Sequence, residues 1–460
     1  MTAAQQIARF AYRFGHDDLT PDLMLACGRA MVDTYCVAIA GRNEPASVRA
    51  VRYAKAHGQT TGMQAEYWGS GELMPLELAV LCNGIAGHVL DYDDVTSPLR
   101  GHPSVAMLPA LLSLAEAMDA DGRDLVSAYA VGFEVICKLS HAMAIDHYAH
   151  GWHSTATIGC IGAAVACAKL LRLDERQIAH AIGLAVAQAA GSRANFGTDA
   201  KSFQAGHSNA SGLRSALMAR EGFESSVGVL DAPFGYLDLY GNGETLTSSL
   251  AALGEQPLEL VRCGIEVKKY PLCYATHRAL DGILDVRKQW TLQLSDVRSV
   301  HVRASAGAFT PLIHHRPKTG LEAKFSMQYA MTAALLDGQV GLASFTNESV
   351  QRPEAQAFLA SVTSDDSAGG PTFPRWTEIQ VTLHDGRSID RRIDALRGSA
   401  QLPLTVDELS DKARDCFAWG DTQGNVDALV ECAMRISHVP VRQWRKAAEL
   451  KFTPKETPCH

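Results

Sequence analysis

Residues 1–262 have a helical hydrophobic pattern, and several of the predicted helices are apolar on nearly every face. The helix expected over residues 159–171 consists almost entirely of Gly, Ala, Val, Ile, Leu and Cys. A helix without a polar face is buried inside a bundle and does not lie on its surface. The long apolar runs that accompany it, 22–40, 76–90, 105–118 and 125–145, therefore predict a large helical domain.

The core of this domain is expected to consist of small side chains. Aromatic residues make up only 7% of the chain, and its 38 Gly residues and many Ala residues let helices approach closely. One helix start is especially clear, because Asp174 precedes an apolar run and Gln177 follows three residues later, as in a capping box.

The hydrophobic pattern changes after Arg262. Val297, Val300 and Val302 lie in a β-branched stretch, which predicts a strand. Apolar and polar residues alternate before the Asp385-Gly386 dipeptide, and an apolar pattern resumes after it, so residues 377–394 predict a β-hairpin. Between these strand regions a helix is expected over residues 320–336.

Helices return at the end of the chain, over residues 406–419 and 425–436. The simplest arrangement is a mainly α protein in which residues 1–262 and 400–460 form a large all-helical domain. Residues 263–399 form a smaller α+β domain inserted into it. Residues 361–374, rich in Ser, Asp, Gly and Pro, are predicted to be a mobile loop.

Composition excludes several classes of function. Hydrophobic residues at 47% and charged residues at 20% are ordinary for a folded protein and exclude a disordered scaffold. The net charge of −8 and the lack of a basic stripe argue against nucleic acid or an anionic membrane as a partner. No apolar run has the length of a signal peptide near the start, and no CxxC pair occurs among the 11 Cys. We therefore expect a cytoplasmic protein with reduced thiols.

Four clusters of residues are candidates for chemistry. The first is Asp91-Tyr92-Asp93-Asp94 followed by Arg100-Gly101-His102-Pro103-Ser104. Three carboxylates so close together repel one another unless cations, solvent or a metal offset their charge. Arg100 and His102 supply cations in the same loop, and a carboxylate beside His102 would set its tautomer and raise its basicity. The alternative is a solvated helix end with a capping loop.

The second cluster contains His147, His150 and His153. Their spacing of three residues is compatible with a metal site, but Gly151 interrupts a continuous helix and no Glu completes a known metal motif. We expect no metal and no other cofactor. His153 at the start of the next helix is the preferred functional residue, because the helix dipole keeps its ring neutral. A structural His is the alternative.

The remaining two clusters are rich in lysine. The first surrounds Lys201 with turn glycines, but it lacks the spacing of a phosphate-binding loop, so a carboxylate is the expected ligand. The second, Lys268-Lys269-Tyr270-Pro271-Leu272-Cys273, leads to His277 at the predicted domain boundary. A pair of Lys at such a boundary suits an anionic ligand. A Cys273–His277 thiol dyad is the less favoured alternative, since no third orienting partner is evident.

Taken together, these clusters resemble the MmgE/PrpD family. The resemblance rests on the acidic motif with Gly101-His102-Pro103-Ser104, Gly151-Trp152-His153, Gly197 to Lys201 with Gly206, Lys268 to Cys273 with His277, and Ala323-Lys324-Phe325-Ser326. The motifs follow one another in the family's order over nearly the whole chain. The resemblance implies a helical domain from both chain ends with an inserted α+β lid, and a homodimer.

The resemblance also assigns site residues. It places Asp91, His102, His153, Lys201 and Lys268 in an active site between the domains, with Arg100, Lys269, Cys273 and His277 as substrate-binding residues. Cys273 stands where the decarboxylase branch of the family has a functional His. Residues 95–100 lack the Trp-rich insert of the dehydratase branch and look more like the iminodisuccinate epimerase branch.

The first expectation is therefore a cofactor-independent epimerase that removes a proton next to a carboxylate of an iminodisuccinate-like acid. His153, or a Lys whose pKa nearby cations lower, would be the base, opposed by Lys201 or Lys268. The alternative is a lyase that dehydrates a 2-methylcitrate-like acid or, less favoured, decarboxylates cis-aconitate. An outside alternative is a carboxylate-binding helical protein without catalysis.

Overall fold

The computed structural model describes residues 1–59, 62–242, 245–367 and 375–452. The chain divides into two compact units, which are described separately. Unit 1 comprises Met1–Val267 and the segment from Leu409, and unit 2 comprises Lys268–Glu408. Residues 263–399 are the segment expected to be inserted.

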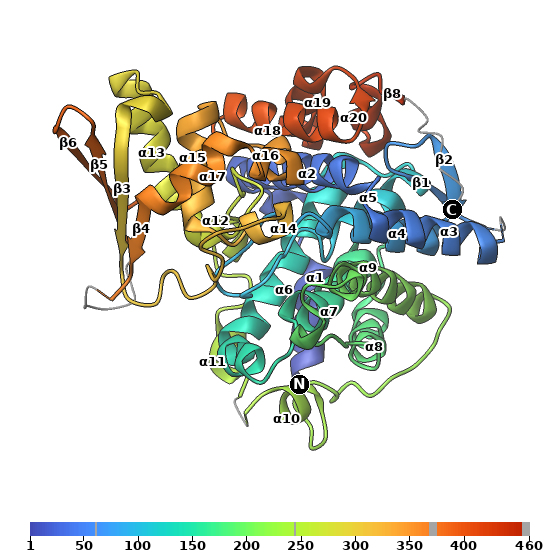
Figure 1. Ribbon diagram of the computed structural model, residues 1–460. Helices are drawn as coiled ribbons and strands as arrows, with labels where there is room; N and C mark the ends of the chain where they lie inside the picture. The colour runs from blue at the N-terminus through green and yellow to red at the C-terminus, as the bar shows by residue number, and fades with distance from the viewer. Residues whose placement is uncertain (60–61, 243–244, 368–374, 453–460) are drawn as a thin grey trace. The chain divides into compact units, whose positions relative to one another are not determined.

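Unit 1 is a helical bundle that buries the apolar helix α7 (Ser154–Leu170) almost completely. The long helices are α1 (Ala3–Arg13), α2 (Pro21–Gly41), α3 (Pro45–His57), α4 (Leu76–His88), α5 (Leu108–Ala117), α6 (Gly122–Ala149), α7 (Ser154–Leu170), α8 (Glu175–Val186) and α9 (Asp199–Arg220). α7 packs against α6, α8 and α9, and all but one of its residues are buried (Figure 1). The expected all-apolar core helix is thus confirmed.

Short helices and the end of the chain complete unit 1. These are α10 (Tyr236–Tyr240), α11 (Thr247–Ala251) and α12 (Glu259–Arg262), then α18 (Val406–Trp419), α19 (Val426–Met434) and α20 (Val441–Lys446). α19 packs on α2 and α20 on α5, so the last helices of the chain lie beside early ones (Figure 1). α2 is long and apolar enough to cross a membrane, but 78% of its most apolar window is buried within the protein, as in a core helix.

Close helix contacts depend on glycine where α4 crosses α9. A Cβ on Gly84 would lie 2.7 Å from the Gly206 Cα, and a Cβ on Gly206 would lie 2.4 Å from the Leu81 carbonyl oxygen. This contact fixes α9, which carries Lys201 in its first turn, against the helix that leads into the Asp91 loop. The predicted capping box at Asp174 and Gln177 is also confirmed.

Unit 2 combines a four-stranded sheet with short helices. Its strands β3 (Val297–Ala304), β4 (Val362–Asp365), β5 (Thr377–Leu383) and β6 (Ser388–Ile393) have the order β4-β3-β5-β6, with only β3 and β4 parallel. Its helices are α13 (His277–Trp290), α14 (Gly320–Ala323), α15 (Met327–Asp337), α16 (Asn347–Val350) and α17 (Pro353–Phe358). α13 and α15 pack on the sheet and bury its apolar face (Figure 1). The predicted hairpin is confirmed.

Three sequence predictions need correction. Unit 1 is not all-helical, because β1 (Gln64–Tyr67) pairs with β2 (Glu72–Pro75) and β7 (Thr422–Gln423) with β8 (Lys451–Phe452). The helix expected over 320–336 is two helices, because Ser326 caps a new one by accepting from the Tyr329 N–H. The loop predicted over 361–374 contains β4, and its residues 368–374 lie outside the described ones.

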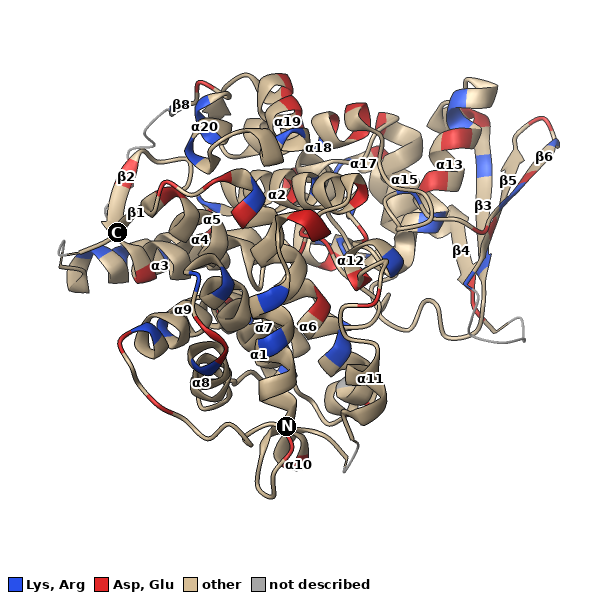
Figure 2. Ribbon diagram, turned by 180° about the vertical axis from the view of Figure 1, so that it is seen from behind, with Lys and Arg blue, Asp and Glu red and all other residues tan. Residues whose placement is uncertain are grey.

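Charged residues are distributed over both units. Lys and Arg positions alternate with Asp and Glu positions in the view of Figure 2, without a continuous basic stripe among the residues described there.

Candidate active site

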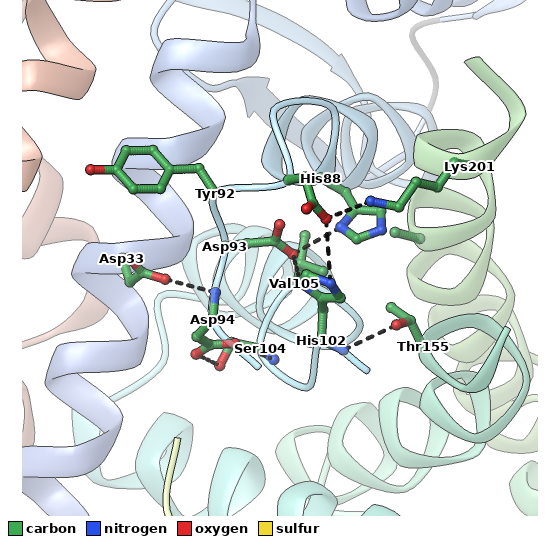
Figure 3. A network of polar contacts seen from close by, with 12 residues as sticks. Asp33, His88, Tyr92, Asp93, Asp94, His102, Ser104, Val105, Thr155 and Lys201 are labelled. Atoms are coloured by element: carbon green, nitrogen blue, oxygen red, sulfur yellow. Dashed lines mark hydrogen bonds and ion pairs between the residues drawn. The ribbon is translucent and has the colours of Figure 1, made fainter. Parts of the chain in front are cut away.

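The loop after α4 brings Asp91 to Lys201. Asp91 has a left-handed backbone (φ 55°), and its N–H donates to the His88 carbonyl at 3.2 Å, which turns the chain sharply at the end of the helix. Lys201 Nζ donates to Asp91 Oδ1 at 2.6 Å (Figure 3). Both side chains are partly exposed, at 20% for Lys201 and 33% for Asp91, so this ion pair lies at the open side of the cluster.

Asp93 joins the buried His88 and the partly buried His102. His88 Nδ1 lies 2.9 Å and His102 Nδ1 lies 3.0 Å from the same oxygen, Asp93 Oδ2 (Figure 3). Burial alone would raise the pKa of Asp93, but the His102 and His88 rings together hold that pKa below its usual value. Asp93 is therefore ionised. His88 directs its Nδ1–H toward this carboxylate, and His102 Nδ1 lies within ion-pair distance of it. The other nitrogen of His102, Nε2, lies 3.6 Å from Asp91 Oδ1.

A close contact with α7 fixes the position of His102. The His102 N–H donates to Thr155 Oγ1 at 3.0 Å. A Cβ on Gly101 would lie 2.7 Å from that same Thr155 oxygen, so only glycine allows the approach. Behind the loop, Asp94 accepts from Ser104 and its N–H donates to Asp33 Oδ2 at 3.0 Å.

His153 is the N-cap of α7, as the sequence predicted, and is nearly buried. Its Nδ1 lies 2.6 Å from Gln204 Oε1, an acceptor, so the Nδ1 carries the proton and Nε2 has the free lone pair. Burial, with the nearby His88 ring, lowers the pKa of His153 to about 2. His153 is thus neutral at physiological pH. The centroid of its ring lies 5.0 Å from that of Phe196, in an edge-on contact, and 5.7 Å from that of His88, in a stacked one.

Five further residues were predicted for the site: Arg100, Lys268, Lys269, Cys273 and His277. Arg100 is exposed, and no ion pair joins it to this cluster among the described residues. Four more belong to unit 2. Lys268 is buried, Lys269 Nζ donates to Glu408 Oε1 at 2.7 Å, and Cys273 is half-buried. His277 Nε2 contacts the Leu272 carbonyl at 3.2 Å. The roles predicted for these four residues remain predictions.

The three histidines considered as a metal site do not converge. His147 contacts the Tyr240 carbonyl through Nδ1 at 2.8 Å and Thr157 Oγ1 through Nε2 at 2.6 Å. His150 is exposed, and His153 contacts Gln204. His147 is therefore a structural residue that connects α6 with α7 and with the end of α10.

Sequence reasoning missed His88, Asp93 as the shared acceptor, and Gln204. The sequence did contain a signal for His88. This residue lies at the end of an apolar predicted helix, where burial is expected, and it precedes Asp93 by five residues. Gln204 follows Lys201 by one helical turn, but its distance from His153 along the chain gave no local signal.

The assembled cluster can orient an acid or base beside a cation. Asp93 fixes the His102 ring, Lys201 supplies positive charge, and His153 presents a neutral nitrogen in a nearly buried position. Such a set can transfer a proton at carbon and stabilise charge on carboxylate oxygens.

Comparison with known proteins agrees with this chemistry. Sequence models of the MmgE/PrpD N-terminal and C-terminal domains match residues 5–249 and 270–434. The cis-aconitate decarboxylase of Homo sapiens is 28% identical over 443 residues, which cover 92% of this chain and 91% of that protein. The cis-aconitate decarboxylase of Aspergillus terreus is 25% identical over 439 residues, covering 89% and 88%.

Proposed function

Since the chain belongs to the MmgE/PrpD family, we propose that it is a lyase that acts on a small polycarboxylic acid, with cis-aconitate as the first candidate substrate. The chain is an enzyme of the isomerase or lyase type found in this family. The epimerase expected first has no support among these relatives, which are cis-aconitate decarboxylases and therefore lyases.

One observation of the site carries the proposal. His102 contacts Asp93 through Nδ1, and its Nε2 lies 3.6 Å from Asp91 Oδ1 of the Lys201–Asp91 ion pair at the open side of the cluster. Loss of CO₂ leaves an electron pair on carbon, which nearby positive charge stabilises until a proton donor quenches it. Lys201 supplies the charge, and His102 is the donor that this geometry favours.

A second candidate is dehydration of a 2-methylcitrate-like acid. The resemblance to the family implies a functional His in the decarboxylase branch at the position of Cys273, and this difference favours dehydration. In that reaction a base of the site removes a proton next to a carboxylate, and an acid protonates the departing hydroxyl.

A substrate screen in deuterium oxide tests the proposal. We expect CO₂ release from cis-aconitate, or water loss from 2-methylcitrate, with formation of an unsaturated acid detected by NMR. Deuterium incorporation with inversion of iminodisuccinate and no new alkene or CO₂ would contradict the lyase and restore the epimerase.

A further inference from the structure

A second cluster of ligand-type side chains lies outside the candidate active site, where α6 and α12 pack together in unit 1. His141 Nε2, Glu259 Oε2 and Cys263 Sγ all lie within 4.8 Å of one another. The Glu259 oxygen is 3.5 Å from His141 Nε2 and 2.8 Å from Cys263 Sγ.

The two helices bring these atoms together through their own geometry. Glu134, Lys138 and His141 follow one another at spacings of four and three, so they share one face of α6. α6 carries both signs of charge along its length (Figure 2). Cys263 is the C-cap of α12, and its N–H donates to the Glu259 carbonyl at 2.9 Å, which places both side chains on one side of this turn.

Other contacts hold the Glu259 carboxylate in place. Lys138 Nζ donates to Oε1 at 2.7 Å, and the Glu259 N–H donates to Glu134 Oε2 at 2.7 Å. Glu259 is only 2% exposed. Its second oxygen, Oε2, is left facing the thiol and the imidazole, so Lys138 and Glu134 orient the ligand as outer-shell partners orient ligands in metal sites.

We propose that His141, Glu259 and Cys263 form a binding site for a divalent ion of the zinc class. A thiolate, an imidazole and one carboxylate oxygen are the ligands such ions prefer, whereas Mg²⁺ and Ca²⁺ take oxygen ligands. Zinc bonds of about 2.0–2.3 Å separate neighbouring ligand atoms by roughly 3.3–3.7 Å. The His141–Glu259 distance of 3.5 Å already fits, and the Cys263 sulfur has to move away by less than about 1 Å. The His141 side chain is 42% exposed, so an ion can enter from solvent.

The site is connected to the loop that carries Asp91 and His102. The Gly264 carbonyl, next to Cys263, accepts from Thr96 Oγ1 at 2.9 Å. Val95 and Glu266 exchange two backbone hydrogen bonds of 3.0 and 2.7 Å. An ion bound at Cys263 therefore stabilises the segment that holds this loop, and its effect is on the stability of unit 1.

Cadmium titration of the chelator-treated full-length protein tests the proposal. We expect one equivalent of Cd²⁺ to produce the ultraviolet charge-transfer band of a cadmium thiolate, and Zn²⁺ to displace it. Cys263→Ser removes the band. Cys432→Ser, the matched control at another half-buried Cys of unit 1, keeps it. A band that survives in Cys263→Ser, or no saturable binding, would overturn the site.

A second variant separates metal binding from folding. His141 is exposed, so His141→Ala is expected to fold with an unchanged circular dichroism spectrum and to bind Cd²⁺ about tenfold or more weakly. His150→Ala, at an exposed His of the same region, should bind normally. Wild-type affinity in His141→Ala would contradict the role of the imidazole.

Discussion

One carboxylate oxygen of Asp93 contacts both His88 and His102. The contact with His102 Nδ1 decides that Nε2 is the nitrogen that faces the Lys201–Asp91 pair. A carboxylate that contacts a ring nitrogen orients the imidazole ring. Asp93 is thus a positioning residue that acts through His102.

Asp93→Asn tests this role. An amide keeps the size of the side chain but removes the charge, so we expect kcat to fall by about a hundredfold or more while KM changes little. Asp17→Asn, at an exposed Asp of unit 1, is the control. A fall in kcat that matches a loss of folded protein would leave Asp93 with a structural role only.

His153→Ala tests the neutral ring at the start of α7. If His153 transfers a proton, the variant should lose turnover by about a hundredfold or more while remaining folded. His150→Ala, three residues away and exposed, should retain full turnover. Unchanged turnover in His153→Ala would remove this residue from the mechanism.

The buried neutral histidines make stability depend on pH. Burial lowers the pKa of His88 from 6.5 to about 4, despite its contact with Asp93. The unfolded chain therefore binds a proton below pH 6.5 that the folded state does not bind until about pH 4, so stability decreases as pH falls through this range. At pH 5, His88 should have lowered the free energy of unfolding by about 2 kcal/mol relative to its value at high pH.

Urea unfolding between pH 7 and pH 4.5 measures this effect. In His88→Gln the decrease should be shallower, because one of the groups responsible is absent. Asp93 does not affect this pH range. Its pKa is lowered, so its contribution to the free energy of unfolding is lost only at still lower pH. An identical slope in the variant and the wild type would contradict the assignment.

At the scale of helices, the crossing of α4 and α9 positions Lys201 relative to the Asp91 loop. The close approach at Gly84 and Gly206 leaves no room for a side chain. The glycines at this crossing therefore allow close packing in the core and also set the position of Lys201 in the site.

Gly206→Ala is predicted to destabilise the protein by about 1–3 kcal/mol, because the added Cβ would overlap the Leu81 carbonyl and push the helices apart. Turnover per folded molecule should also fall, since Lys201 moves with α9. Gly228→Ala is the control, because its Cβ would have no neighbour closer than 3.4 Å. Equal urea midpoints for the two variants would show that the helices adjust without cost.

At the scale of the whole molecule, a buried ion pair joins the last part of the chain to the first. Lys412 of α18 donates to the Tyr92 carbonyl at 2.8 Å and contacts Asp33 of α2 at 2.5 Å. Both side chains are almost fully buried. The returning segment thus supports the backbone of the loop that carries Asp91 and Asp93.

Lys412→Met is expected to cost about 3–5 kcal/mol of stability, because Asp33 would be left buried without its cation. The double variant Asp33→Asn/Lys412→Met should recover part of this loss, since no uncompensated charge remains. Chemical denaturation of the three proteins measures the difference. A double variant that is less stable than Lys412→Met would contradict this explanation.

The local sequence predicted most of the elements, for physical reasons that are visible in particular residues. The apolar run of α7, the capping box at Asp174 and the hairpin at Asp385-Gly386 each depend on neighbours within a few positions. The break at Ser326 and the short strand β4 were missed, because a helical pattern continues across Ser326 and β4 depends on pairing with β3.

The site was only partly predictable. The sequence by itself determined the helical core, its small side chains and the residue types available for acid, base and cation. The tertiary structure decided which of them meet: Lys201 with Asp91, His153 with Gln204, and His88 with His102 through Asp93. It also decided that His147 is structural. The reason is that hydrogen bonds and burial act through distances in space, and helices that are far apart in sequence supply the partners.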